Sequence, residues 1–205
     1  MDNTVQTLKF ISSKVWTIDT NMSDSNIGGR KNKNIANHIF IANGIINEVK
    51  NEKDMCVDLE LLDISKCFDS LWTCEIMNDM YEVMKPNDKL SLMYRENLES
   101  HVAIKTPVGK TKRNVVEHIE MQGSVLAPIK TSVQIDTIGK ECSQKGDNLY
   151  VYKKSVGVPP LSFVDDIAAF AKCGQDSLKL NIFLNRKVEM KKLQLNKEKC
   201  KKLHI

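Results

Sequence analysis

The sequence contains no long apolar run. Its longest ones, such as 39–42 and 167–171, fall far short of the ~20 residues that a membrane span requires, and the polar N-terminus carries no apolar signal-peptide core. Repeats, low-complexity tracts and linkers rich in proline or glycine are absent as well, which favours one continuous domain of 205 residues. We therefore expect a soluble intracellular protein, in the nucleus or the cytoplasm, without a membrane partner.

Closely spaced cysteines are also missing. No two of the six are nearer than seven residues in sequence, so no CxxC pair is available to build a local zinc site or redox couple. We expect reduced, mostly buried thiols. The four histidines are scattered, a pattern more typical of structural residues than of ligands. The cysteines are Cys56, Cys67, Cys74, Cys142, Cys173 and Cys200.

Charge of one sign is scarce in two segments. Residues 51–100 hold twelve acidic and five basic residues, whereas residues 179–202 hold nine basic and two acidic ones. This polarity suits a protein with a cation-binding centre and a phosphate-facing flank. A solvated, lysine-rich helix face explains the second segment equally well.

Hydrophobic periodicity predicts an α+β fold. Residues 55, 57, 59 and 61 alternate with polar positions, which indicates a half-buried strand that ends at Asp63. The core order of strand, helix, helix, strand, strand, helix, strand is typical of a split βαβ, ferredoxin-like sheet with helices on one face, and leaves the other face free for a duplex. The expected helices are 34–50, 70–84, 88–99, 123–140 and 176–193, the expected core strands are 55–63, 149–153, 160–164 and 199–205, and a hairpin is expected over 100–119.

Three aspartates stand out against this framework. Asp165 and Asp166 interrupt an apolar run with strand character on both sides, and Asp63 ends a strand about a hundred residues earlier. Each feature alone is also explained by a solvated turn or an ordinary strand end. Together they provide the carboxylates with which two divalent ions, roughly 3.5 to 4 Å apart, can activate a 3′ hydroxyl and steady a leaving pyrophosphate.

Five motifs in order resemble those of reverse transcriptases. Asp63-Ile-Ser-Lys-Cys-Phe68-Asp69 resembles their first catalytic motif, and Phe163-Val-Asp-Asp166 resembles their aromatic-x-Asp-Asp motif. The residues of two motifs, Lys-Cys-Phe-Asp and Leu-Asn-x-x-Lys-Cys, are similar to those of the non-LTR (LINE-like) retrotransposon branch. The other three segments are Gly28-Gly-Arg-Lys31 (fingers), Gln122-Gly-Ser-Val-Leu-Ala-Pro128 (the Gln-Gly motif) and Leu195-Asn-Lys-Glu-Lys-Cys200.

This resemblance implies an RNA-directed DNA polymerase that uses two Mg²⁺ ions, or Mn²⁺ in their place, with an RNA template, a DNA primer and dNTPs as partners. Asp63, Asp165 and Asp166 would bind the ions, with the Ile64 carbonyl as an extra ligand, and Lys199 would protonate the departing pyrophosphate. The implied substrate-binding residues are Arg30 and Lys33 on the triphosphate, Phe68 under the sugar, where it disfavours a 2′ hydroxyl, and Gln122 and Gly123 along the nucleotide and template path.

Other positions receive no such role. Asp69 is expected to make a local hydrogen bond, and Asp58 and Glu60 to point away from Asp63 as bystanders. Cys67 and Ala127 stand where many relatives carry Ala and Gly, and both are small enough to be tolerated.

The resemblance also implies a division of the chain into a partial fingers segment, 1–54, and a palm with an inserted hairpin, 55–205. Residues 1–24 do not resemble the family's fingers strands, and the sequence ends where a thumb would begin, so we expect a fragment or a decayed element. Two alternatives stay open: a catalytically inactive palm that only binds RNA, and an unrelated metal-binding or phosphotransfer domain.

Overall fold

The computed structural model describes residues 21–84, 100–116, 127–144 and 149–205. Its centre is a four-stranded antiparallel sheet in the order β10-β1-β9-β8. With helices between β1 and β8 and between β9 and β10, this order gives the predicted α+β, split βαβ arrangement. The strands are β1 (Val57–Leu62), β8 (Leu161–Phe163), β9 (Asp166–Lys172) and β10 (Lys201–His204).

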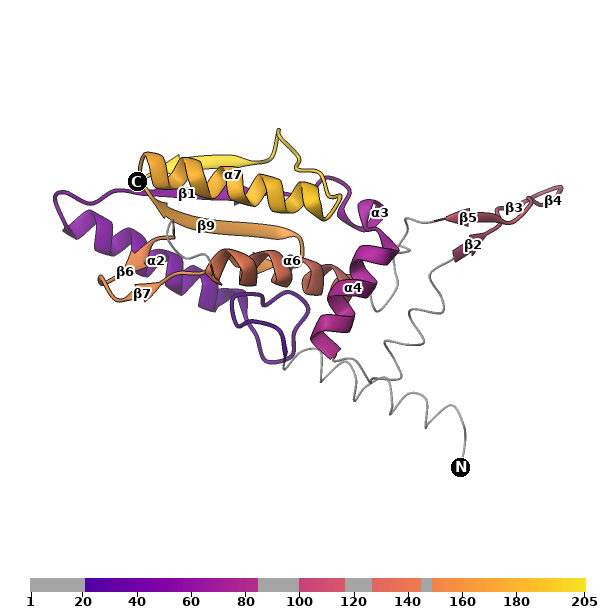
Figure 1. Cartoon of the computed structure of the whole chain (residues 1–205), viewed down its shortest axis with the longest axis horizontal. Helices are drawn as coiled ribbons and strands as arrows, with labels where there is room; N and C mark the ends of the chain where they lie inside the picture. The colour runs from indigo at the N-terminus through magenta and orange to yellow at the C-terminus, as the bar shows by residue number, and fades with distance from the viewer. Residues whose placement is uncertain (1–20, 85–99, 117–126, 145–148) are drawn as a thin grey trace, which may run out of the picture.

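Helices on one face of the sheet enclose the main core. Leu62 and Ile167, which are paired across β1 and β9, share this core with Leu180, Leu184 and Val188 of α7, and Figure 1 shows α7 running along β1 and β9. The helices and the short turn beside them are α3 (Cys67–Ser70), α4 (Thr73–Met84), α6 (Ala127–Gln144) and α7 (Gln175–Met190).

The opposite face is not free, contrary to the prediction. Helix α2 (Ile35–Asn51) begins at an Asn34 cap, whose side chain accepts a hydrogen bond from the Ala36 N–H. Its Ile45 and Val49 pack with Phe170 of β9 in a second core. The period of two in β1 explains this second core, because Val57 and Leu59 point away from α7 and present apolar surface that must be covered.

One expected core strand lies elsewhere. Residues 151–152 form β6 (Val151–Tyr152), which pairs with β7 (Val156–Gly157) in a separate ribbon. The central strand beside β1 is instead β9, whose unbroken Ile-Ala-Ala-Phe-Ala run is largely buried between the two helical layers. Such a run lacks the alternation of a half-buried strand. The expected helix 88–99 lies outside the described residues.

The expected hairpin is present and carries positive charge. It consists of β2 (Ser100–Val102) paired with β5 (Asn114–Val116), and of β3 (Lys105–Thr106) paired with β4 (Gly109–Lys110). Figure 1 shows it extending away from the sheet. We call its exposed cations the basic hairpin: Lys105, Lys110, Lys112 and Arg113. Within the described residues, none of the helices has the length and apolarity that a membrane crossing requires.

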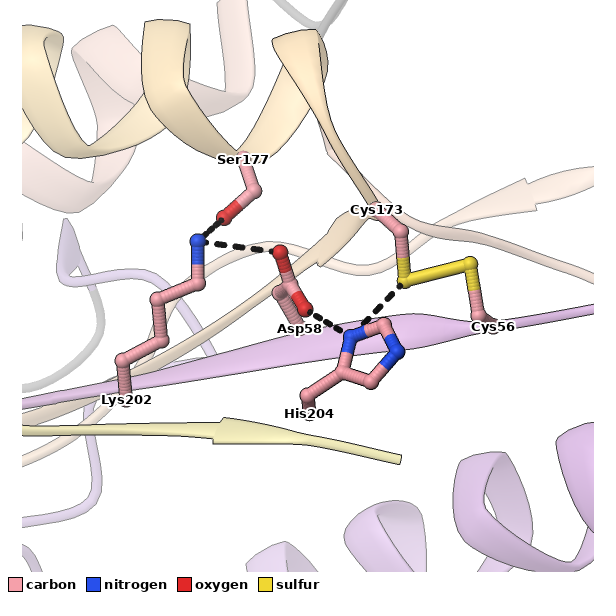
Figure 2. The surroundings of a disulfide bond; sticks show 6 residues. All are labelled: Cys56, Asp58, Cys173, Ser177, Lys202 and His204. Atoms are coloured by element: carbon pink, nitrogen blue, oxygen red, sulfur yellow. Dashed lines mark hydrogen bonds and ion pairs between the residues drawn. A yellow bond between two sulfur atoms is a disulfide. The ribbon is translucent and has the colours of Figure 1, made fainter.

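Two cysteines are joined, which corrects the expectation that all thiols are reduced. Cys56 and Cys173 form a disulfide, with their Cα atoms 5.8 Å apart (Figure 2). The strand register brings them together: Val57 pairs with Lys172, so the next residues outward on β1 and β9 face each other. Cys67, Cys74, Cys142 and Cys200 are free.

Candidate active site

Asp63 follows β1 directly and is fixed by the 195–200 segment. The Asn196 N–H donates to the Asp63 carbonyl at 2.8 Å, and Ile64 forms an isolated bridge with Leu195. The Asp63 carboxylate remains partly exposed, and Lys199 Nζ lies 3.3 Å from its Oδ1. The Leu-Asn-x-x-Lys segment therefore positions the first aspartate and also brings a cation to it.

Asp165 and Asp166 lie at the turn between β8 and β9. Phe163 pairs with Asp166, which leaves Val164 and Asp165 as a two-residue loop. Val164 has a φ of 57°, the left-handed conformation that the first residue of such a tight hairpin loop adopts. This conformation is costly for a β-branched residue, so the surrounding structure must hold the turn.

Residues 25–28, the Gly28 segment, provide that support. Asn26 bridges to Ser162 of β8, the Ile27 N–H donates to the Ser162 carbonyl at 3.1 Å, and the Ser162 N–H donates to the Ser25 carbonyl at 2.8 Å. Gly28 then passes so close to the turn that a Cβ on it would lie 2.1 Å from the Val164 nitrogen. Only glycine permits this approach.

The three carboxylates interact electrostatically. Burial raises the pKa of Asp165, and the negative charge of Asp63 adds to the effect. Burial also raises the pKa of Asp166, with further contributions from Asp165 and Asp63, while Lys199 opposes both shifts. The pKa of the Cys67 thiol rises to about 12, mainly because it is buried and partly because Asp165 and Asp63 are near. The site therefore concentrates negative charge that one lysine only partly offsets.

This donor set fits hard divalent cations, which prefer carboxylate oxygens. The arrangement is open, however. Within the described residues, three potential ligand atoms lie within 4.8 Å of one another only at Asp58, Cys173 and His204. Asp63 and Asp166 also border an apolar pocket of about 570 Å³ between the sheet and the N-terminal half of α2.

Phe68 lies in α3, five residues after Asp63, and is partly buried against the main core. Its backbone follows Lys66, which adopts a left-handed φ of 46° and turns the chain away from β1. The Phe68 ring is thus half-covered and lies near the Asp63 end of the sheet. Its predicted position under the sugar of the nucleotide stays a prediction.

Two cations of the 28–33 segment, Arg30 and Lys33, contact the protein itself. Arg30 Nη1 donates to the Asn26 carbonyl at 2.6 Å and also to the Ser23 carbonyl, so the guanidinium holds the loop that supports β8. Lys33 Nζ pairs with the exposed Asp24 at 2.6 Å. Their assignment to a triphosphate stays a prediction. Gln122 and Gly123 lie outside the described residues.

A family model described as reverse transcriptase (RNA-dependent DNA polymerase) matches residues 5–204. The chain belongs to this family. No sequence among curated proteins matches it.

Solved structures of telomerases and of an RNA-dependent RNA polymerase share the fold. An apo telomerase from Candida tropicalis, truncated from its C-terminal domain, superposes with a TM-score of 0.68 at 15% identity, over 96% of this chain and 40% of that one. Telomerase from Candida albicans in complex with a TWJ fragment of telomeric RNA gives 0.68 at 11% identity, over 93% and 34%. The RNA-dependent RNA polymerase of BmCPV at its elongation state gives 0.59 at 11%, over 94% and 18%.

This reverse transcriptase domain corresponds to only part of the telomerase chains. It spans less than half the length of the telomerase chains that it matches, and at these identities the structural likeness establishes the fold.

Sequence reasoning also misses a residue that supports the site. That residue is Gly28, which the motifs identify only as part of a fingers segment. The signal in the sequence that could have indicated its role is a glycine in the loop before the first helix, because glycine permits a close approach of two backbones.

Proposed function

We propose that this domain is the catalytic part of an RNA-directed DNA polymerase that adds dNTPs to a primer 3′ hydroxyl on an RNA template. Family membership supports template-directed nucleotidyl transfer. The observation that carries the proposal is electrostatic: Asp63, from a segment a hundred residues away, contributes to the raised pKa of both Asp165 and Asp166.

Asp63, Asp165 and Asp166 would hold two Mg²⁺ ions, or Mn²⁺. Bound there, such ions activate the attacking hydroxyl and neutralise the leaving pyrophosphate. The chain's own contribution is orientation. The bonds from Asn196 to Asp63 and from the 25–28 segment to β8 hold both carboxylate-bearing turns against the same end of the sheet.

Lys199 is suited to deliver a proton to the pyrophosphate. Its side chain is 66% exposed and its ammonium group already lies beside Asp63, so small rotations would bring it to a phosphate held by an ion at that carboxylate. Phe68 would lie under the sugar, Arg30 and Lys33 would bind the triphosphate after exchanging their present partners, and Gln122 and Gly123 would line the template path.

The residues of two motifs favour a non-LTR retrotransposon as the element that encodes this domain. Lys66-Cys67-Phe68-Asp69 and the segment from Leu195 to Cys200 are the residues that support this assignment. RNA and a DNA primer are accordingly the proposed macromolecular partners.

The test is extension of a labelled DNA primer on an RNA template with Mg²⁺ or Mn²⁺. We expect divalent-dependent dNTP addition by the wild-type chain and its loss in Asp165→Asn. Asp54→Asn, an exposed aspartate in the loop before β1, is the matched control and should retain activity. Equal activity in Asp165→Asn and wild type would refute the metal assignment, and RNA binding without extension by the folded wild-type chain would favour the RNA-binding palm.

A further inference from the structure

A second cluster of metal-ligating side chains lies at the far end of the same sheet. Cys56 directly precedes β1 and is two residues from Asp58 along the same extended segment, so the two side chains point to the same face. Cys173 is opposite Cys56, and His204 of β10 is paired with Asp58. Residues directly opposed on neighbouring strands also share a face, so all four side chains gather on the α7 side (Figure 2).

The ligand atoms are already close. His204 Nδ1 lies 2.8 Å from Asp58 Oδ1 and 3.5 Å from Cys173 Sγ. These three atoms lie within 4.8 Å of one another, and Cys56 Sγ is bonded to Cys173 Sγ. Asp58 is buried, whereas Cys56 and His204 are exposed, so a small reductant and an ion can reach the cluster from solvent.

We propose that reduction of the Cys56–Cys173 disulfide converts this cluster into a four-ligand site for Zn²⁺. A dithiol reductant supplies two electrons and two protons: the S–S bond breaks, two cysteine thiols form, and the dithiol becomes a disulfide. Zn²⁺ then displaces the two thiol protons and binds both sulfurs, His204 Nδ1 and Asp58 Oδ1. The Nδ1 proton that now faces Asp58 leaves or moves to Nε2.

The ligand set selects a zinc-type ion over Mg²⁺. Two thiolates, one imidazole and one carboxylate are a combination that Zn²⁺ accepts in tetrahedral sites, whereas Mg²⁺ requires oxygen ligands. The site also lies apart from the candidate active site. Asp58 and Asp63 are five residues apart along an extended segment, on the order of 16 Å.

A neighbouring cation offsets part of the charge. Two thiolates and Asp58 carry three negative charges, which Zn²⁺ reduces to one. Lys202 Nζ lies 3.0 Å from Asp58 Oδ2 and 3.7 Å from Glu60 Oε1, so it is shared by the two carboxylates, and it donates to Ser177 Oγ at 2.7 Å. Such an outer partner fixes the orientation of a ligating carboxylate, and here it leaves Oδ1 directed at His204.

The experiment uses Co²⁺ as a spectroscopic probe, followed by displacement with Zn²⁺. The chain is reduced with a water-soluble phosphine, which takes an oxygen from water as it becomes the phosphine oxide and supplies no competing thiol. Co²⁺ bound by thiolates gives an intense near-ultraviolet charge-transfer band, which Co²⁺ at the aspartates cannot give. Circular dichroism of the reduced wild type shows whether the chain remains folded without the disulfide.

We expect one Co²⁺ per reduced chain with the thiolate band, displaced by one Zn²⁺, and no band in the oxidised chain. Cys173→Ser, Cys56→Ser and His204→Ala should each weaken Co²⁺ binding by at least about tenfold, by comparison with the loss of an outer partner. Cys74→Ser, an exposed free cysteine on α4, should bind as the wild type does. Absence of the band in reduced, folded wild type, wild-type binding in Cys173→Ser, or loss of binding in Cys74→Ser would each overturn the proposal.

Discussion

Gly28→Ala tests whether the close approach between the Gly28 segment and the β8–β9 turn sets the position of the catalytic carboxylates. An added Cβ would lie 2.1 Å from the Val164 nitrogen and 2.8 Å from its Cα, both backbone atoms, whereas real Cβ contacts do not fall below 3.0 Å. The difference, 3.0 − 2.1, means that the two backbones must separate by at least 0.9 Å. Asp165 is the next residue along the turn and must move with it.

A displacement of this size is costly for chemistry. A misplacement of about 1 Å lowers rate by about 100-fold, which corresponds to about 2.7 kcal/mol in the activation barrier. We therefore expect single-turnover primer extension by Gly28→Ala to fall about 100-fold. The melting temperature should decrease by only a few degrees, because the two cores do not include Gly28.

Two glycines serve as controls. Gly157→Ala places its Cβ in open space, and Gly29→Ala strains a φ of 68° while its Cβ lies 3.8 Å from Pro128. Gly157→Ala should match the wild type in rate and stability, and Gly29→Ala should lose stability with little loss of rate. If folded Gly28→Ala extends primers at the wild-type rate, the loop yields rather than the turn, and the positional argument is refuted.

Three further expectations concern selectivity, pH and salt. Phe68→Val should raise the ratio of ribonucleotide to deoxyribonucleotide incorporation, and an unchanged ratio in a folded variant would remove the sugar-gate assignment. Burial raises the pKa of Asp79 from 3.8 to about 6 despite its pairing with Lys191. The folded chain therefore holds this proton more tightly than the unfolded chain, and stability should decline by up to about 3 kcal/mol as pH rises from about 4 to about 6. Urea titrations of Asp79→Asn should lack that part of the decline. All four cations of the basic hairpin can be replaced by Gln, and binding to single-stranded RNA then measured at several salt concentrations. The slope of the logarithm of the binding constant against the logarithm of the salt concentration should become shallower by about 0.7 for each phosphate that the hairpin no longer neutralises. A slope equal to that of the wild type would show that the hairpin does not touch RNA.

The local features of this fold were predictable because they depend on neighbours in sequence. The alternation before Asp63 predicted β1, and the apolar spacing after Asn34 predicted α2, including its start. Features set by non-local pairing were not. The run after Asp166 has strand character in the sequence, but only pairing with β1 on one side and β8 on the other makes β9 a central strand.

The same limit applies to the two polar clusters. Family motifs are enough to indicate Asp63, Asp165 and Asp166, but nothing in sequence places Gly28 against Val164. Cys56 and Cys173 are 117 residues apart, so a search for closely spaced cysteines could not relate them. Their meeting follows from the antiparallel register of β1 and β9, which the sequence does not specify.

The Cys56–Cys173 bond closes the polypeptide into a covalent ring. The ring contains Asp63, Asp165 and Asp166, and it also contains the exposed hairpin. A protease that cuts this hairpin once would therefore open the ring without producing two separate pieces. The nicked chain would migrate as one species in a denaturing gel run without reductant and would divide into two fragments when thiol is added.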